Sequence, residues 1–67
     1  MNVSVEQIRA DRWEARLSVA TPAGSRYFCE CGRNRTAALL ALRQSLARYR
    51  GDSYRDARAA VLEHALA

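Results

Sequence analysis

The sequence predicts an α+β fold in which a three-stranded antiparallel meander is followed by two helices packed on one face. Through the first half of the chain, apolar and polar residues alternate, as they do in half-buried strands. The segments between these stretches are short, and the second contains Pro22 and Gly24, which are typical of turns. In the second half, apolar residues recur every three to four positions, as on one face of a helix.

The expected sheet covers residues 2–31. Its first strand, residues 2–8, carries Val3 and Val5 on one side, and Ala10-Asp11-Arg12 forms the turn that follows. Residues 13–21 alternate more clearly and place on one face Trp13, Ala15, Leu17 and Val19. The third strand, residues 26–31, has two faces, which consist of Tyr27, Cys29 and Cys31 on one side and Arg26, Phe28 and Glu30 on the other.

Gly32 is expected to end the sheet, and the first helix spans residues 34–50, capped by Asn34 or Thr36. Its apolar stripe comprises Ala38, Leu42, Ser45, Leu46 and Tyr49, with Leu39 beside it. Gly51 is expected as its C-terminal cap. Ser53 then opens the second helix, residues 53–66, in a short variant of the capping box. We expect the core to join the sheet to the first helix through Trp13, Leu17, Val19, Leu39, Leu42 and Leu46.

The length of 67 residues predicts a single domain, 1–67, with one small core and little room for a deep catalytic pocket. We therefore expect a protein that is not an enzyme. No apolar run approaches the roughly 18 residues of a membrane span, and no signal peptide is visible. Two cysteines without an export signal fit a reducing cytoplasm.

Cys29 and Cys31 raise the question of metal or redox chemistry. A structural zinc site needs four ligands, and His64 is the only histidine in the chain. A redox Cys-x-x-Cys motif is absent, and no nucleophile stands at a recognisable spacing from His64. Free cysteine is among the most buried residue types, so we expect both cysteines in the core and predict no metal, cofactor or catalytic residue.

Charge gives a more positive indication of function. The net charge is +4, and all eleven basic residues other than His64 are arginines. No acidic residue occurs between Glu30 and Asp52, although that segment holds Arg33, Arg35, Arg43, Arg48 and Arg50. Such a stretch of one sign favours an anionic partner over an ordinary solvated helix face.

The turn from Gly32 to Thr36 is the best candidate for a site. It precedes a helix, where free backbone amides and the helix dipole favour an anion, and an arginine can clamp a phosphate with two donors. The alternative is that Arg33 and Arg35 only solvate the turn. The expected nucleic-acid-binding residues of this segment are Arg33, Asn34, Arg35, Arg43, Arg48 and Arg50.

A further group, Arg12, Arg16 and Arg26, is expected near the outer face of the sheet, together with Phe28. This face could lie on a nucleic-acid groove. Glu14 and Glu30 are expected on the same face and count against such contact, and cross-strand ion pairs are the alternative.

The stretch from Trp13 to Tyr49 resembles the C-terminal half of the double-stranded-RNA-binding domain, in which a glycine and a basic turn lead into a helix of alanine and leucine pairs. Here Gly32 to Thr36 matches the turn, and the helix pattern is matched by Ala38, Ala41-Leu42, Ser45-Leu46 and Tyr49. The N-terminal helix and the lysines of that family are missing.

The chain also resembles the three-stranded sheet plus helix of ethylene-response-type and phage-integrase arm-type DNA-binding domains. The residues that carry this resemblance are Trp13-x-Ala15-x-Leu17, Gly24-x-Arg26, Thr36 and Ala38. This resemblance implies DNA contact through the sheet residues Arg12, Arg16 and Arg26. The basic first strand of those domains is missing here.

Together these features predict a small non-catalytic nucleic-acid-binding protein that contacts mainly the phosphate backbone, with DNA and RNA both open. The alternative is a protein-binding module from a phage or mobile element, an inhibitor or antitoxin-like partner that docks on a host nucleic-acid-handling complex. A homodimer through Leu62 and Leu66 of the second helix belongs to that alternative.

Overall fold

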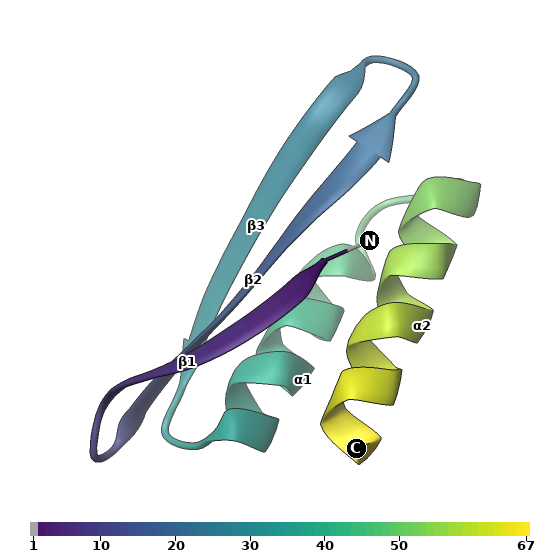
Figure 1. The fold of residues 1–67 in the computed structure, drawn as a ribbon. Helices are drawn as coiled ribbons and strands as arrows, with labels where there is room; N and C mark the ends of the chain where they lie inside the picture. Colours follow the sequence, from purple (N-terminus) through teal and green to yellow (C-terminus); the bar gives the residue numbers. More distant parts are fainter. Residues whose placement is uncertain (1) are drawn as a thin grey trace.

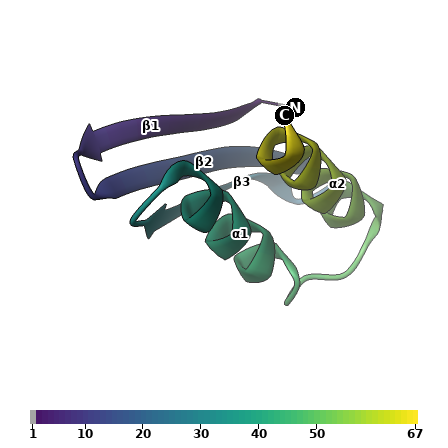
Figure 2. The same cartoon turned by 90° about the horizontal axis from the view of Figure 1, so that it is seen from below.

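Within residues 2–67, which the computed structural model describes, three strands and two helices follow one another as the sequence predicts. The strands pair antiparallel in the order β1-β2-β3, and both helices pack on one face of the sheet (Figures 1 and 2). The predicted βββαα fold is confirmed. The elements are β1 (Val3–Arg9), β2 (Arg12–Thr21), β3 (Gly24–Gly32), α1 (Arg35–Leu46) and α2 (Asp52–Leu66).

The strand register decides which residues face the helices. Residues that lie directly opposite each other in antiparallel strands share a face of the sheet. Leu17 of β2 is buried and lies opposite both Val3 of β1 and Phe28 of β3. The inner face of β3 is therefore the face that carries Phe28.

The core lies between this inner face and the helices. It contains the predicted Leu17, Val19, Leu39, Leu42 and Leu46, all buried, whereas Trp13 is only partly buried. The α2 helix completes the core with Tyr54, Ala57 and Val61. Burial of apolar side chains from both helices is the main stabilising contribution in so small a fold.

The prediction that Cys29 and Cys31 are core residues is wrong. Both are exposed free thiols on the outer face, and Tyr27, which shares this face, is 81% exposed. The physical reason is the register: Arg16 of the outer face lies opposite Cys29. A shift of one residue exchanges the two faces of a strand, and the apolar character of Tyr27, Cys29 and Cys31 indicated the wrong one.

Gly32 allows α1 to begin directly under the end of β3. A Cβ atom at this position would lie 2.7 Å from the carbonyl carbon of Ala37 and would also meet the backbone nitrogen of Ala38. Asn34 then caps the helix, because its Oδ1 accepts a hydrogen bond of 2.8 Å from the Ala37 amide. Of the two predicted caps, Asn34 is the one that the structure uses.

The α1 helix ends at Leu46, earlier than the predicted end at residue 50. Tyr49 leaves the helix and stacks on Tyr54 with ring centroids 4.9 Å apart. Arg58 of α2 stabilises this exit, because its Nη1 donates to the carbonyl oxygens of Leu46 and Tyr49, each at 3.0 Å. The contacts give the Tyr49 carbonyl a donor and add a second donor to the Leu46 carbonyl, which also accepts from the Tyr49 amide.

The predicted start of the second helix is also corrected. The N-cap residue of α2 is Gly51, whose positive φ of 111° suits glycine, and the helix begins at Asp52, one residue before Ser53. Among the described residues, no side chain caps this end by a hydrogen bond. Gly51 thus starts α2, although the sequence indicated it as the C-terminal cap of the preceding helix.

Candidate nucleic-acid interface

The antiparallel meander brings two basic segments to one end of the molecule. In such a sheet the β1–β2 turn and the end of β3 lie on the same side, and the opposed pair Trp13 and Gly32 shows this directly. Arg9 and Arg12, which flank this turn as the last residue of β1 and the first of β2, therefore lie beside the segment that carries Arg33 and Arg35. We call these four residues, Arg9, Arg12, Arg33 and Arg35, the basic end.

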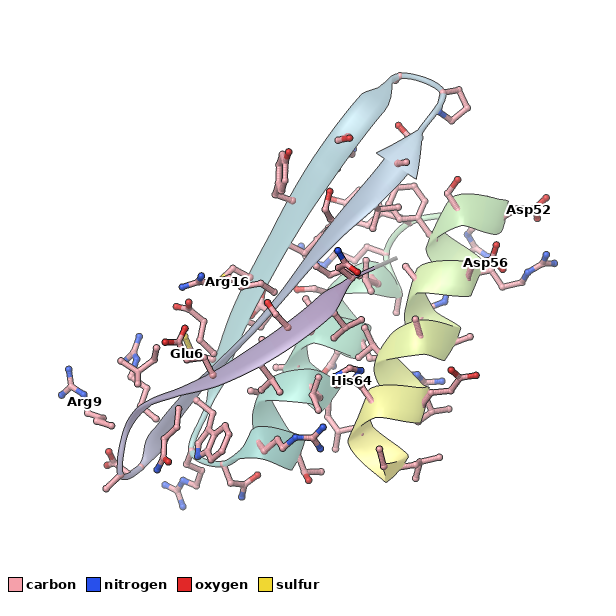
Figure 3. All side chains as sticks on the ribbon, in the orientation of Figure 1. Glu6, Arg9, Arg16, Asp52, Asp56 and His64 are labelled. Atoms are coloured by element: carbon pink, nitrogen blue, oxygen red, sulfur yellow. The ribbon has the colours of Figure 1, made fainter. Side chains whose placement is uncertain are left out.

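Side-chain contacts support this arrangement. The Nη2 of Arg12 lies 3.6 Å from Sγ of Cys31, which places the guanidinium over the end of β3. A shallow depression beside it is lined by Arg9, Asp11, Arg12, Cys31 and Gly32. Arg9 points away from the body of the molecule (Figure 3). Asp11 is the only acidic residue in segments 9–12 and 32–35, so the basic end has an excess of positive charge.

The start of α1 adds the positive end of a helix dipole to the same region. The first turn of α1 contains no acidic residue. Arg33 and Asn34 are exposed and Arg35 is half-buried. Anions bind favourably where free helix amides and arginine side chains converge, and phosphate oxygens fit the planar guanidinium group.

The other predicted arginines of this chain segment lie away from the basic end. The twelve residues of α1 span about 18 Å at 1.5 Å per residue, so Arg48 and Arg50 lie just beyond the opposite end of this helix. Arg43 is exposed in the last turn of α1. The structure therefore divides the predicted segment into two basic regions.

Arg26 and Phe28 lie on the inner face of β3, and their predicted place on the outer face is wrong. The guanidinium of Arg26 lies 5.0 Å from the ring centroid of Tyr49, which is a cation–π geometry. Phe28 contacts the same ring edge-on, with centroids 5.4 Å apart. The two residues thus close the aromatic cluster next to the α1–α2 connection.

Arg16 does lie on the outer face, as predicted, and forms an ion pair with Glu14. The hydrogen bond and the charge of this carboxylate raise the pKa of Arg16 above its ordinary value. Its charge is therefore partly compensated within the sheet. Among the predicted sheet arginines, Arg12 is the one that the structure places at the basic end.

Cys29 shares the outer face with this ion pair. Partial desolvation raises the pKa of the Cys29 thiol above its ordinary value, and the nearby Glu14 carboxylate raises it further. A thiol in this environment stays protonated at neutral pH, whereas nucleophilic cysteines have a lowered pKa. The environment of Cys29 is therefore that of an exposed thiol without the lowered pKa of a catalytic nucleophile.

Arg9 is not among the arginines that the sequence pattern predicts, because it lies ahead of the turn expected at residues 10–12 and far from the segment that starts at residue 33. The missing information was the pairing between strands. Once a meander is predicted, its connectivity already requires the first turn and the end of the third strand to share an end. That topological rule could have added Arg9 to the candidate residues.

Within residues 2–67, no group of three or more His, Cys, Asp or Glu side chains is placed to hold a metal ion. The helices in this range are too short or too polar to span a membrane.

Comparisons of the chain with protein-family models, with curated proteins and with solved structures find no match.

Proposed function

We propose that this chain is a small non-catalytic nucleic-acid-binding protein that contacts the phosphate backbone through the basic end. One observation carries the proposal: the pairing of Trp13 with Gly32 joins the arginines of the β1–β2 turn to those at the start of α1. Segments 9–12 and 32–35 carry four arginines and one acidic residue next to a helix N-terminus, and the nearby Glu14, opposite Cys31, is paired with Arg16.

The chemistry of these groups favours backbone contact over base reading. Guanidinium groups and backbone amides are the usual donors to phosphate oxygens, and such contacts fix a protein on a duplex without reading its sequence. The expected binding is therefore salt-dependent and of low sequence specificity. Arg48 and Arg50, at the other end of α1, extend the contact only if the nucleic acid runs along the helix.

The resemblance to the double-stranded-RNA-binding domain makes duplex RNA a candidate ligand as well as duplex DNA. That family has a helix ahead of its strands, whereas the described residues 2–67 open with β1. Here α2 lies beside α1 on the same sheet face (Figure 2), and the C-terminal half of α2 packs near the start of β1. A common depression lined by Asn2, Val3, Glu63 and His64 reflects this proximity. The sheet and α1 thus keep the arrangement that the resemblance implies, with α2 as a second helix on the same face. Both duplex RNA and duplex DNA are therefore tested.

A salt titration tests the proposal. Nuclease-treated protein is mixed with fluorescently labelled duplex DNA or duplex RNA at several salt concentrations, and the dissociation constant is measured by anisotropy. Neutralisation of three to five phosphates predicts a slope of roughly −3 to −4.5 in a plot of log K against log salt. Absence of binding to either duplex at low salt would refute the proposal.

A second candidate function is docking on a protein of the host. The observation in its favour is that Leu66 of α2 is 78% exposed and Leu40 of α1 is 48% exposed. Co-purification from the native host, with and without nuclease, separates the two functions. A partner protein that stays bound after nuclease treatment and at high salt supports the second candidate, whereas loss of all partners with nuclease supports the first.

A further inference from the structure

The two edges of the sheet differ in a way that points to a partner for β3. Within the described residues, β1 and β3 are the edge strands. The pairing of β1 has an irregularity between Gln7 and Arg9, and such bulges protect an edge from further pairing. The pairing of β3 is continuous over nine residues, from Gly24 opposite Thr21 to Gly32 opposite Trp13. A long regular edge strand presents a row of backbone donors and acceptors to another strand.

The charges on β3 are arranged symmetrically about Phe28. Arg26 precedes Phe28 by two residues, Glu30 follows it by two, and all three side chains lie on the inner face. Charged residues that point inward usually protect an edge strand. Here their signs are opposite, so an antiparallel copy of β3 centred on Phe28 would place each Arg26 directly opposite the other copy's Glu30.

The helix layer leaves room for such a copy. Ser45 of α1 donates a hydrogen bond of 2.8 Å to Glu30, so this side of the helix faces the inner side of the β3 edge. Ala37, Ala41 and Ser45 follow one another at intervals of four and form a stripe of small, half-buried side chains. A groove between the edge and the helix is lined by Glu30, Ala41, Gln44, Ser45, Ala47 and Arg48. Small side chains permit close approach of a second helix.

We propose that two copies of this chain pair through their β3 edges, antiparallel and centred on Phe28, into a continuous six-stranded sheet. The two copies of α1 then face each other along their small-residue stripes. The contact is isologous, as in most homodimers, and each Arg26–Glu30 pair occurs twice. This interface lies on the edge opposite β1 and leaves Leu62 and Leu66 of α2 free.

The dimer also determines where the basic ends lie. Because the two β3 strands run antiparallel, the two copies of Gly32 lie at opposite ends of the shared strand pair. Eight residue steps of about 3.3 Å separate Gly24 from Gly32, so the two basic ends would be about 26 Å apart or more. This consequence is independent of whether the basic end binds nucleic acid.

Charge reversal provides a sharp test. The oligomeric state of the nuclease-treated full chain is measured by sedimentation equilibrium from micromolar to near-millimolar concentration. Arg26→Glu and Glu30→Arg each create two like-charged pairs across the interface, and we expect each to weaken dimerisation about tenfold or more. A mixture of the two single variants restores both pairs in a heterodimer, and so does the double variant Arg26→Glu with Glu30→Arg in a homodimer.

Two controls separate these effects from loss of folding. Circular dichroism must show a native spectrum for each single variant, because Glu30 also bonds Ser45 and Arg26 also contacts Tyr49. Leu66→Glu, on the exposed face of α2, should leave dimerisation unchanged. Recovery of dimer on mixing two folded, monomeric variants supports the proposal. A wild-type chain that stays monomeric throughout, or a dimer that resists both reversals, overturns it.

Discussion

Trp13 lies directly opposite Gly32 in the β2–β3 pair, and this relationship holds the candidate site together. Three separate pieces of the chain meet there: the β1–β2 turn, the end of β3 and the start of α1. The turn supplies Arg9 and Arg12, and the start of the helix supplies Arg33 and Arg35. Changes at this junction should therefore affect both stability and the position of the arginines.

Gly32→Ala tests the close approach of α1 to the end of β3. An added Cβ would lie 2.7 and 2.9 Å from the carbonyl carbon and Cβ of Ala37, and the atoms it meets include backbone that cannot rotate away. We expect a loss of about 2 kcal/mol or more in the free energy of unfolding, measured by urea denaturation.

Gly24→Ala is the matched control for this substitution. A Cβ at Gly24 meets nothing within 4 Å, so the cost arises only from its positive φ of 117° and should be about 1 kcal/mol. Equal stability losses for the two alanine variants would contradict the close approach at Gly32.

Asn34 tests the cap of α1 and the charge of the basic end separately. Asn34→Ala removes the acceptor for the Ala37 amide and should lower stability by about 1 kcal/mol. Asn34→Asp retains the acceptor, and its negative charge interacts favourably with the positive end of the helix dipole, so the variant should keep its stability. It also adds a negative charge beside Arg33 and Arg35, which should weaken duplex binding.

Thermal denaturation and anisotropy titration give the two readouts for these variants. Thr36→Ala serves as the control, since Thr36 is the predicted cap that the structure does not use, and it should change neither stability nor binding much. If Thr36→Ala proves more destabilising than Asn34→Ala, the assignment of the cap is wrong.

Alternation in β2 was sufficient to predict its buried face, whereas β3 was ambiguous from sequence. Both faces of β3 carry apolar side chains, and the more apolar one, with Tyr27 and both cysteines, is the exposed one. The pairing of Leu17 with Phe28 decides the matter, and register of this kind is a tertiary property. One local signal was present. Gly32 must face the helix, and it is an even number of residues from Phe28, so the two residues lie on the same face of the strand.

Because Cys29 and Cys31 are exposed, their thiols should be accessible to reagents in the native protein, whereas buried thiols would not be. Both thiols should react with 5,5′-dithiobis(2-nitrobenzoic acid) in the native protein, without denaturant. Replacing both by alanine should change the free energy of unfolding by about 0.5 kcal/mol or less, as is usual for surface positions. Thiols that react only after denaturation would place them in the core.

The environment of Cys29 also predicts the pH dependence of its alkylation. The reactive species is the thiolate, and desolvation together with Glu14 raises the pKa of this thiol above its ordinary 9.0. In a Cys31→Ser variant, the rate of reaction with iodoacetamide should therefore reach half its maximum above pH 9.0. A midpoint below that value would contradict the described surroundings of Cys29.

Arg58 tests the early end of α1. Its guanidinium donates to the carbonyl oxygens of Leu46 and Tyr49, both at 3.0 Å, and the helical spacing could not reveal this contact from α2. Arg58→Met keeps the length of the side chain but removes both hydrogen bonds, and we expect a loss of about 1.5–3 kcal/mol in urea denaturation. Arg55→Met, at an exposed position of the same helix, should cost little; equal effects of the two substitutions would contradict the role of Arg58.

The candidate site was predictable in part. The arginines at the start of α1 were visible as a basic turn ahead of a helix cap, which is a local pattern. Arg9 and Arg12 are brought to the same end only by strand pairing. Arg26 lies on the inner face and not on the predicted outer face, because the two faces of β3 are exchanged relative to the prediction. Local sequence thus located half of the basic end, and topology supplies the other half.

The most direct test of the proposed function compares the salt dependence of duplex binding for two double variants of equal charge. Arg12→Ala with Arg33→Ala removes two arginines from the basic end, and Arg48→Ala with Arg50→Ala removes two from the opposite end of α1. The account predicts that the first variant reduces the magnitude of the slope of log K against log salt by about 1.8, because two phosphate contacts are lost, while the second leaves it nearly unchanged. Equal reductions in both variants, or a larger reduction in the second, would contradict a site at the basic end.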